Sequence, residues 1–233
     1  MTVKLPAIHL PKPVLLVSQC LLGDPVRYDG AHKQHPAIAQ HLLPHITTAA
    51  LCPEVAAGMG VPRPAIRRQQ MGDSEIIALA SSGAALANSL LSTSQRLATH
   101  ATTQTAVAAI LKARSPSCGI ESSPLFNPDG TILALGDGLF VQQLRKHQTH
   151  LLLVSEEQLH DAESCVYFVR LCQLALALKL NLLREDWLVY LRKANALHQL
   201  PALGLQEVVR ELSGESAELH YLEPLPFIGR GKN

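Results

Sequence analysis

Three of the five cysteines in this chain stand in short motifs of turn-forming residues. Cys20 lies in Ser-Gln-Cys-Leu-Leu-Gly, Cys52 in Cys-Pro-Glu, and Cys118 in Ser-Pro-Ser-Cys-Gly. Free cysteine often fills space in a protein core, but an inert core position needs no such neighbours. Loops that follow regular elements are the usual place for chemistry on a rigid scaffold. If the fold gathers these three thiols, they form a three-thiolate site.

Thiolates are soft ligands, and a set of three is compatible with zinc or with an iron–sulfur cluster. Structural zinc sites usually show closely spaced cysteine pairs and four ligands, and the motifs around Cys20, Cys52 and Cys118 show neither. A 4Fe–4S cluster with only three cysteine ligands would leave one iron open to a soft atom such as sulfur. The residues alone leave both metals open.

The other two cysteines favour a structural role. Cys165 and Cys172 are seven residues apart in an apolar segment with helical spacing, so they share one face of the predicted helix. We predict that this face is buried and that both cysteines belong to the core.

An acidic residue accompanies the second cysteine motif. Glu54 follows Cys52 by two residues, and a carboxylate beside a metal can act as a general acid or base. The alternative role for Glu54 is to cap a helix or to pair with Arg63 or Arg27. Its place in the Cys-Pro-Glu triplet favours the functional interpretation.

Other polar residues near these motifs are candidates for binding. Ser115 and Ser117 can hydrogen-bond a substrate or a cluster sulfide, or they can cap the end of a helix. Arg27 can orient a planar polar substrate from the loop after the first cysteine. Arg63 and Lys112 are further cationic candidates, although such residues are more often solvated or paired with an acid.

The elements that must position these residues alternate along the chain. Apolar runs predict buried strands at 14–18, 47–52 and 150–155, and helical spacing predicts helices at 36–43, 83–114 and 137–147. A loop rich in glycine and proline is expected up to residue 70. This alternation predicts an α/β fold, Rossmann-like, with a mainly parallel sheet flanked by helices. Cys20 and Cys52 follow predicted strands, whose carboxyl ends meet at one edge of such a sheet.

The composition changes after about residue 157. Residues 161–196 show a nearly continuous helical pattern, and a short amphipathic segment follows at 205–212. We therefore predict an α/β domain over residues 12–158 and a small helical C-terminal extension over residues 159–233.

Bulk properties narrow the classes of function. A chain of 233 residues with 47% hydrophobic residues can bury a sizeable core. Lys and Arg number 20 against 19 Asp and Glu, so no strong field favours nucleic acid or an anionic membrane. No signal peptide or membrane-spanning run is found. We predict a soluble, cytoplasmic protein whose five cysteines stay reduced.

The motifs also occur together, and in the same order, in a known family. They are Ser18–Gly23, Val26–Gly30, Cys52–Val55, Pro62–Arg63, Gly83–Ala84, Lys112 and Ser115–Gly119. Over about residues 12–158 the chain resembles the bacterial thiouracil desulfidase family, long known as a domain of unknown function.

The resemblance implies a 4Fe–4S cluster bound by Cys20, Cys52 and Cys118. It also implies a reaction in which water replaces the thiocarbonyl sulfur of a thiolated uracil, without net redox change, while that sulfur is bound at the open iron and leaves as hydrosulfide. In this family a Glu and a Ser assist proton transfer, and these roles fall on Glu54 and Ser115.

Alternative functions stay open. The enzyme could act on thiouridine in a nucleoside or in tRNA, or the chain could be a metal-binding or sensing protein without catalysis. Relatives that act on thiolated tRNA carry a longer RNA-associated module, which residues 159–233 do not resemble. We therefore expect a small thiolated pyrimidine as the substrate and do not favour a nucleic acid. The sequence does not set the oligomeric state.

Overall fold

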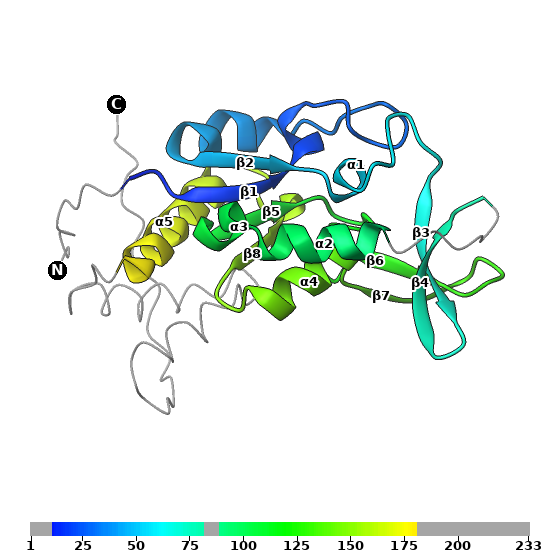
Figure 1. Cartoon of the computed structure of the whole chain (residues 1–233). Helices are drawn as coiled ribbons and strands as arrows, with labels where there is room; N and C mark the ends of the chain where they lie inside the picture. Colours follow the sequence, from blue (N-terminus) through cyan, green and yellow to red (C-terminus); the bar gives the residue numbers. More distant parts are fainter. Residues whose placement is uncertain (1–10, 82–88, 181–233) are drawn as a thin grey trace, which may run out of the picture.

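A four-stranded parallel sheet forms the centre of the computed structural model, which describes residues 11–81 and 89–180 (Figure 1). We call it sheet A. Its strands are β1 (Val14–Ser18), β2 (Thr47–Leu51), β5 (Ala108–Leu111) and β8 (Leu152–Ser155), in the order β2-β1-β5-β8. The predicted α/β class with a mainly parallel sheet is confirmed.

The central strands are apolar because both faces of sheet A are covered. Side chains alternate between the two faces along each strand. Leu15 and Val17 belong to one buried cluster with Ile110, whereas Leu16 belongs to a second cluster with Leu111. The alternation therefore divides the core into two layers.

Helices cover both layers. On the Leu16 face lie α2 (Ser89–Thr99) and α4 (Leu139–His147), which contribute Ala98, Phe140, Val141 and Leu144 to the core. On the other face lie a π-helical turn, η2 (Ile38–Leu42), and the long helix α5 (Ala162–Lys179). The short elements are η1 (Gln19–Leu22), η3 (Leu43–His45), α1 (Pro53–Ala56), α3 (Ala101–Thr105) and η4 (Glu156–Gln158). None of the helices in the described ranges is long and apolar enough to span a bilayer.

A second sheet, sheet B, lies near α1 and was not predicted (Figure 1). Its strands are β3 (Ile66–Met71), β4 (Ser74–Leu79), β6 (Ser123–Phe126) and β7 (Ile132–Gly136), in the order β4-β3-β6-β7. Strands β3 and β6 pair in parallel, and each also belongs to an antiparallel hairpin. The predicted loop up to residue 70 is therefore wrong where α1 and β3 form.

The predicted helix over 83–114 is wrong in its last part. Residues 89–105 form α2 and α3, but the Ala-Ala-Ile-Leu segment that follows is strand β5. All four residues of β5 are completely buried between β1 and β8. Burial in a sheet has overridden an alanine-rich composition that favours a helix.

Helix α5 joins the core of sheet A. Phe168 is completely buried and lies in the same cluster as Leu15 of β1. The rest of the helix predicted to residue 196, and the segment 205–212, lie outside the described residues. The division into 12–158 and 159–233 stays a prediction, and the packing of α5 provides a thermodynamic test of it.

We expect Phe168→Ala to lower the free energy of unfolding of the whole chain by about 3–5 kcal/mol, because it removes a large buried ring. The measurement is chemical unfolding followed by circular dichroism and by fluorescence of Trp187, the one tryptophan of the chain. Val166→Ala, at an exposed position of the same helix, is the control and should change the free energy by less than about 0.5 kcal/mol. Equal effects of the two substitutions would contradict a shared core, and separate transitions for the two probes would support two domains.

Candidate active site

Three neighbouring strands of sheet A each lead into one cysteine motif. Cys20 lies in η1 directly after β1, Cys52 follows β2, and Cys118 lies in the loop between β5 and β6. Strand β1 lies between β2 and β5, and all three run in the same direction. Their carboxyl ends therefore bring the three motifs to one edge of the sheet, where α/β proteins build their sites.

The residues beside two of these cysteines explain their motifs. Gly23 ends η1 with a φ of 105°, a left-handed conformation that glycine adopts without strain. Pro53 occupies the first turn of α1, where its missing N–H costs nothing, and Cys52 is the N-cap residue. The turn-forming neighbours thus set the direction in which the chain leaves each cysteine.

The three thiols act on one another electrostatically. Burial raises the pKa of Cys20 to about 11, and the neighbouring Cys52 adds to this rise. Burial also raises the pKa of Cys118, with further contributions from Cys52, Glu54 and Cys20. Burial likewise raises the pKa of Cys52. The free thiols are therefore protonated at neutral pH, and binding to a metal would release their protons.

The donor set suits a cluster better than a single ion. Within residues 11–81 and 89–180, no three His, Cys, Asp or Glu side chains are arranged to hold one metal ion. All three thiols are free of disulfides, and in a 4Fe–4S cluster each cysteine ligand binds a different iron, so the thiols need not converge on one point. Cys20, Cys52 and Cys118 are thus the residues that could hold such a group.

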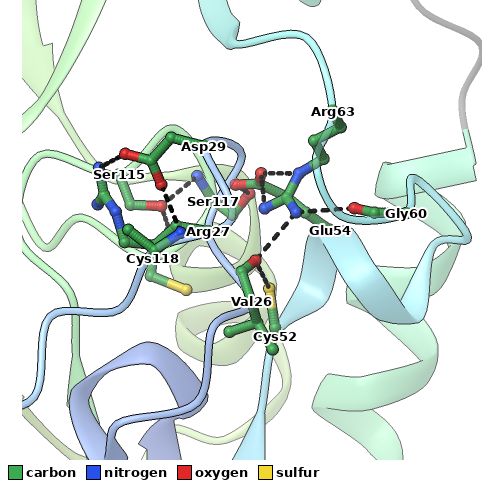
Figure 2. Close-up of polar contacts among 11 residues, drawn as sticks. Val26, Arg27, Asp29, Cys52, Glu54, Gly60, Arg63, Ser115, Ser117 and Cys118 are labelled. Atoms are coloured by element: carbon green, nitrogen blue, oxygen red, sulfur yellow. Dashed lines mark hydrogen bonds and ion pairs between the residues drawn. The ribbon is translucent and has the colours of Figure 1, made fainter.

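Glu54 is buried and both of its oxygens are occupied (Figure 2). Arg63 donates to Oε2 from Nε at 2.9 Å and from Nη2 at 2.7 Å. Ser117 Oγ donates to Oε1 at 2.8 Å. These contacts hold an ionised carboxylate in one orientation. The pairing with Arg63, which the sequence offered as the alternative role of Glu54, is present and places the carboxylate close to Cys118.

Arg63 also joins separate loops. Its Nη1 donates to the carbonyl oxygens of Val26 at 2.9 Å and Gly60 at 3.0 Å, and its backbone N–H donates to Tyr28 at 2.9 Å. The side chain of Arg63 is only 3% exposed, so it is not free to bind an anion from solvent. Arg63 is therefore a positioning residue.

The two serines of the third motif have different roles. Ser115 Oγ accepts hydrogen bonds from the backbone N–H groups of Ser117 at 3.2 Å and Cys118 at 3.1 Å, which fixes the turn. Ser117 is completely buried and touches Glu54 directly. The structure thus gives the direct contact with the carboxylate to Ser117.

The first residues of helix α4 and the glycine before it form backbone hydrogen bonds with the Cys118 loop. The N–H groups of Gly138, Leu139 and Phe140 donate to the carbonyls of Gly119, Pro116 and Ser117 at 2.7 to 2.9 Å. A Cβ atom on Gly138 would lie 2.5 Å from the backbone of Ser117, so only glycine permits this approach. The N–H groups at the start of α4 are therefore used by the Cys118 loop.

The structure contains a polar network that the sequence analysis did not predict. It is formed by Lys112, Glu156 and Ser18. Lys112 Nζ pairs with the buried carboxylate of Glu156, which also accepts the N–H of Ala113 at 2.7 Å. The N–H of Lys112 donates to Ser18 Oγ at 3.1 Å, and Ser18 hydrogen-bonds Cys118. Glu156 follows β8 at the same edge of sheet A, and this position is the signal that could have identified it.

The remaining two cysteines lie in helix α5. Cys165 and Cys172 are completely buried in the cluster that joins α5 to sheet A, which confirms their predicted place in the core.

Comparisons with known proteins agree with this geometry. The model of the 2-thiouracil desulfurase family matches residues 15–158. The chain belongs to this family. A solved structure of a 4Fe–4S-dependent thiouracil desulfidase, TudS, is similar to the chain at 31% identity with a TM-score of 0.51. The match covers 69% of this chain and 99% of TudS.

No curated protein matches the chain. The predicted resemblance is nevertheless confirmed by the family match, and so is the prediction that the chain is an enzyme, a member of a desulfurase family.

We expect Arg63→Met to destabilise the protein by about 3–5 kcal/mol, because the substitution leaves the Glu54 carboxylate buried without its partner. The measurement is chemical unfolding of the metal-free protein. Arg145→Met is a matched control: Arg145 pairs with Asp137 and Glu121 but its side chain is 46% exposed, so its loss should cost at most about 1 kcal/mol. Equal losses for the two variants would contradict a structural role for the buried pair.

Proposed function

We propose that this enzyme removes sulfur from a thiolated pyrimidine with the help of a 4Fe–4S cluster. The observation that carries the proposal is the placement of three free thiols, two of them buried, and the Glu54 carboxylate paired with Arg63 at the same edge of the parallel sheet. Membership of the 2-thiouracil desulfurase family and similarity to a 4Fe–4S-dependent desulfidase support it.

Cys20, Cys52 and Cys118 would hold the cluster. With only three protein ligands, the bound cluster would supply an open iron, a Lewis acid with affinity for the sulfur of a thiocarbonyl group. The overall reaction converts thiouracil and water into uracil and hydrogen sulfide. It balances without an oxidant or a reductant, because oxygen replaces sulfur at a carbon whose oxidation state does not change.

Glu54 would act as the general base and then the general acid in this reaction. Water must lose its protons to become the carbonyl oxygen, and the departing sulfur gains them. An ionised carboxylate in a fixed orientation can accept a proton and deliver it again. Arg63 and Ser117 hold Glu54 in that orientation.

Ser115 and Ser117 would share the role that the family resemblance gives to one serine. Ser117 has the direct contact with Glu54, and Ser115 fixes the turn that carries Ser117 and Cys118. Arg27 would bind the substrate from the loop over Cys20, whose pKa it lowers.

A free base or nucleoside is the substrate that we favour. The charge of the chain is nearly balanced, which gives a polyanion such as tRNA little overall attraction. The cytoplasmic location that we predict would protect an oxygen-sensitive cluster.

The test is purification without oxygen, followed by assays of iron, sulfide and hydrosulfide release from 2-thiouracil. We expect about four irons per chain and release of hydrosulfide. Cys20→Ala, Cys52→Ala and Cys118→Ala should each lose both cluster and activity, whereas Cys165→Ala should keep both. A full cluster in any of the first three variants would show that the ligand set is wrong. A loaded enzyme that acts on thiolated tRNA but not on 2-thiouracil would overturn the choice of substrate.

We expect Glu54→Gln to keep the cluster and to lower turnover by about 100- to 10,000-fold, because glutamine keeps the shape of the side chain but cannot act as a base. Iron content and steady-state turnover are the two measurements. Unchanged turnover would remove Glu54 from the mechanism. The same assays on Ser115→Ala and Ser117→Ala separate the serines, and the larger loss of turnover at full iron content identifies the one that acts with Glu54.

A further inference from the structure

The loop that carries Arg27 is fixed before any substrate binds. The N–H and the carbonyl of Arg27 are both used within the turn 27–31, at 3.2 and 3.0 Å. The carbonyls on either side, of Val26 and Tyr28, both accept hydrogen bonds from Arg63. The backbone of Arg27 is therefore held by the same arginine that orients the carboxylate of the site.

One edge of the Arg27 side chain is bound and another is not. Nη2 pairs with Asp29 at 3.3 Å, and the guanidinium lies 5.4 Å from the centre of the Tyr28 ring. The Nε atom, however, is buried and has no hydrogen-bond partner among the described residues. A buried donor without an acceptor is rare and costly, so this Nε–H requires an acceptor that the described residues do not supply.

The position of this donor relates it to the reaction. Arg27 directly follows Val26, whose carbonyl oxygen lies 4.0 Å from Cys52 Sγ, so the loop that carries the guanidinium contacts one of the three proposed cluster ligands. The side chain is 21% exposed, so part of it reaches solvent while Nε stays buried. A substrate bound at the cysteines would therefore lie beside the loop that carries this donor.

The charges around Arg27 favour a neutral acceptor. Asp29 already balances the guanidinium, and the site also contains the carboxylate of Glu54 and thiols that become thiolates on metal binding. A phosphate would be repelled by these negative groups. A carbonyl oxygen can accept the Nε–H bond without bringing another charge.

From this geometry we infer that Arg27 Nε–H binds the carbonyl oxygen of a thiolated oxopyrimidine that does not react, and thereby selects such substrates. The inference rests on the proposed function and specifies its substrate class. In 2-thiouracil this acceptor is the oxygen at position 4. An amino group at that position, as in 2-thiocytosine, would present a donor to a donor, and pyrimidine-2-thione presents no polar group there. Both are therefore poor substrates.

The test compares these three compounds on the loaded enzyme and on Arg27→Met. We expect Arg27→Met to lower kcat/KM for 2-thiouracil by about 10- to 100-fold and to change kcat/KM for pyrimidine-2-thione little, so that the selectivity collapses. Arg96→Met, at an exposed position on α2, is the control and should keep the selectivity of the native enzyme. Dissociation constants for the same compounds, from the change in cluster absorption, give a readout that does not depend on turnover.

Two results would overturn the inference, and a second variant covers the loss of the cluster. Unchanged selectivity in Arg27→Met would overturn the inference. A shifted reduction potential with unchanged selectivity would also overturn it, because Nε would then bind a cluster sulfide. If Arg27→Met loses iron, Arg27→Lys replaces it: lysine keeps the charge beside Asp29 but lacks the Nε–H, and it should show the same loss of selectivity.

The failure of the proposed function looks different. In that case the native enzyme releases no hydrosulfide from 2-thiouracil, whatever residue stands at position 27. The dissociation constants of 2-thiouracil and pyrimidine-2-thione for the native protein and Arg27→Met then still decide whether Arg27 recognises the carbonyl.

Discussion

The candidate site depends on one buried ion pair, between Arg63 and Glu54. A carboxylate in a protein interior stays ionised only if charged and polar partners replace the water that it has lost. Arg63 supplies most of that replacement, and its remaining donors hold the loops at Val26 and Gly60. Folding of this edge and orientation of the proposed base therefore use the same interactions. A change that loosens the pair would weaken both at once.

The two sheets have separate tasks in building the site. Sheet A delivers three cysteine motifs to one edge, because β1 lies between β2 and β5 and all three strands are parallel. The chain passes from β1 to β2 on one side and reaches β5 on the other, a reversal that opens a crevice in doubly wound folds. Sheet B supports the loops from outside: β3 follows the Arg63 loop, β6 follows the Cys118 loop, and the two strands pair.

The sequence could predict only those elements that are marked by residues close together in the chain. Strands β1, β2 and β8 form where the sequence predicted them, because each segment ends in turn residues. The predicted burial of β2 was wrong: it is an edge strand whose residues are exposed or half-buried. Strand β5 was missed because Ala-Ala-Ile-Leu continues an alanine-rich helical pattern, and only burial between two strands shows its state. Strand β3 contains two arginines and two glutamines, so no apolar run indicates it. The contacts of Arg68 with Glu75 and with the carbonyl of Ser123 make such a strand stable, and these partners are 7 and 55 residues away.

The same limit applies to the site. Cysteine motifs can be recognised from neighbouring residues, because turns are local. The bond between Ser117 and Glu54 joins residues 63 positions apart, and the bond between Lys112 and Glu156 joins residues 44 apart. Such partners depend on the tertiary fold. For this reason the sequence identified Glu54 but did not assign its contact to Ser117 rather than Ser115.

The three backbone bonds between the start of α4 and the Cys118 loop bear on how a cluster is loaded. A ligand on a mobile loop must give up conformational entropy when it binds, and this loss weakens binding. Cys118 has already lost that freedom, because the peptide groups around it are bound to a helix whose Phe140 and Leu144 are completely buried. The loss of conformational entropy that orders Cys118 thus occurs on folding. It does not occur on cluster binding, so it does not reduce the affinity for the cluster.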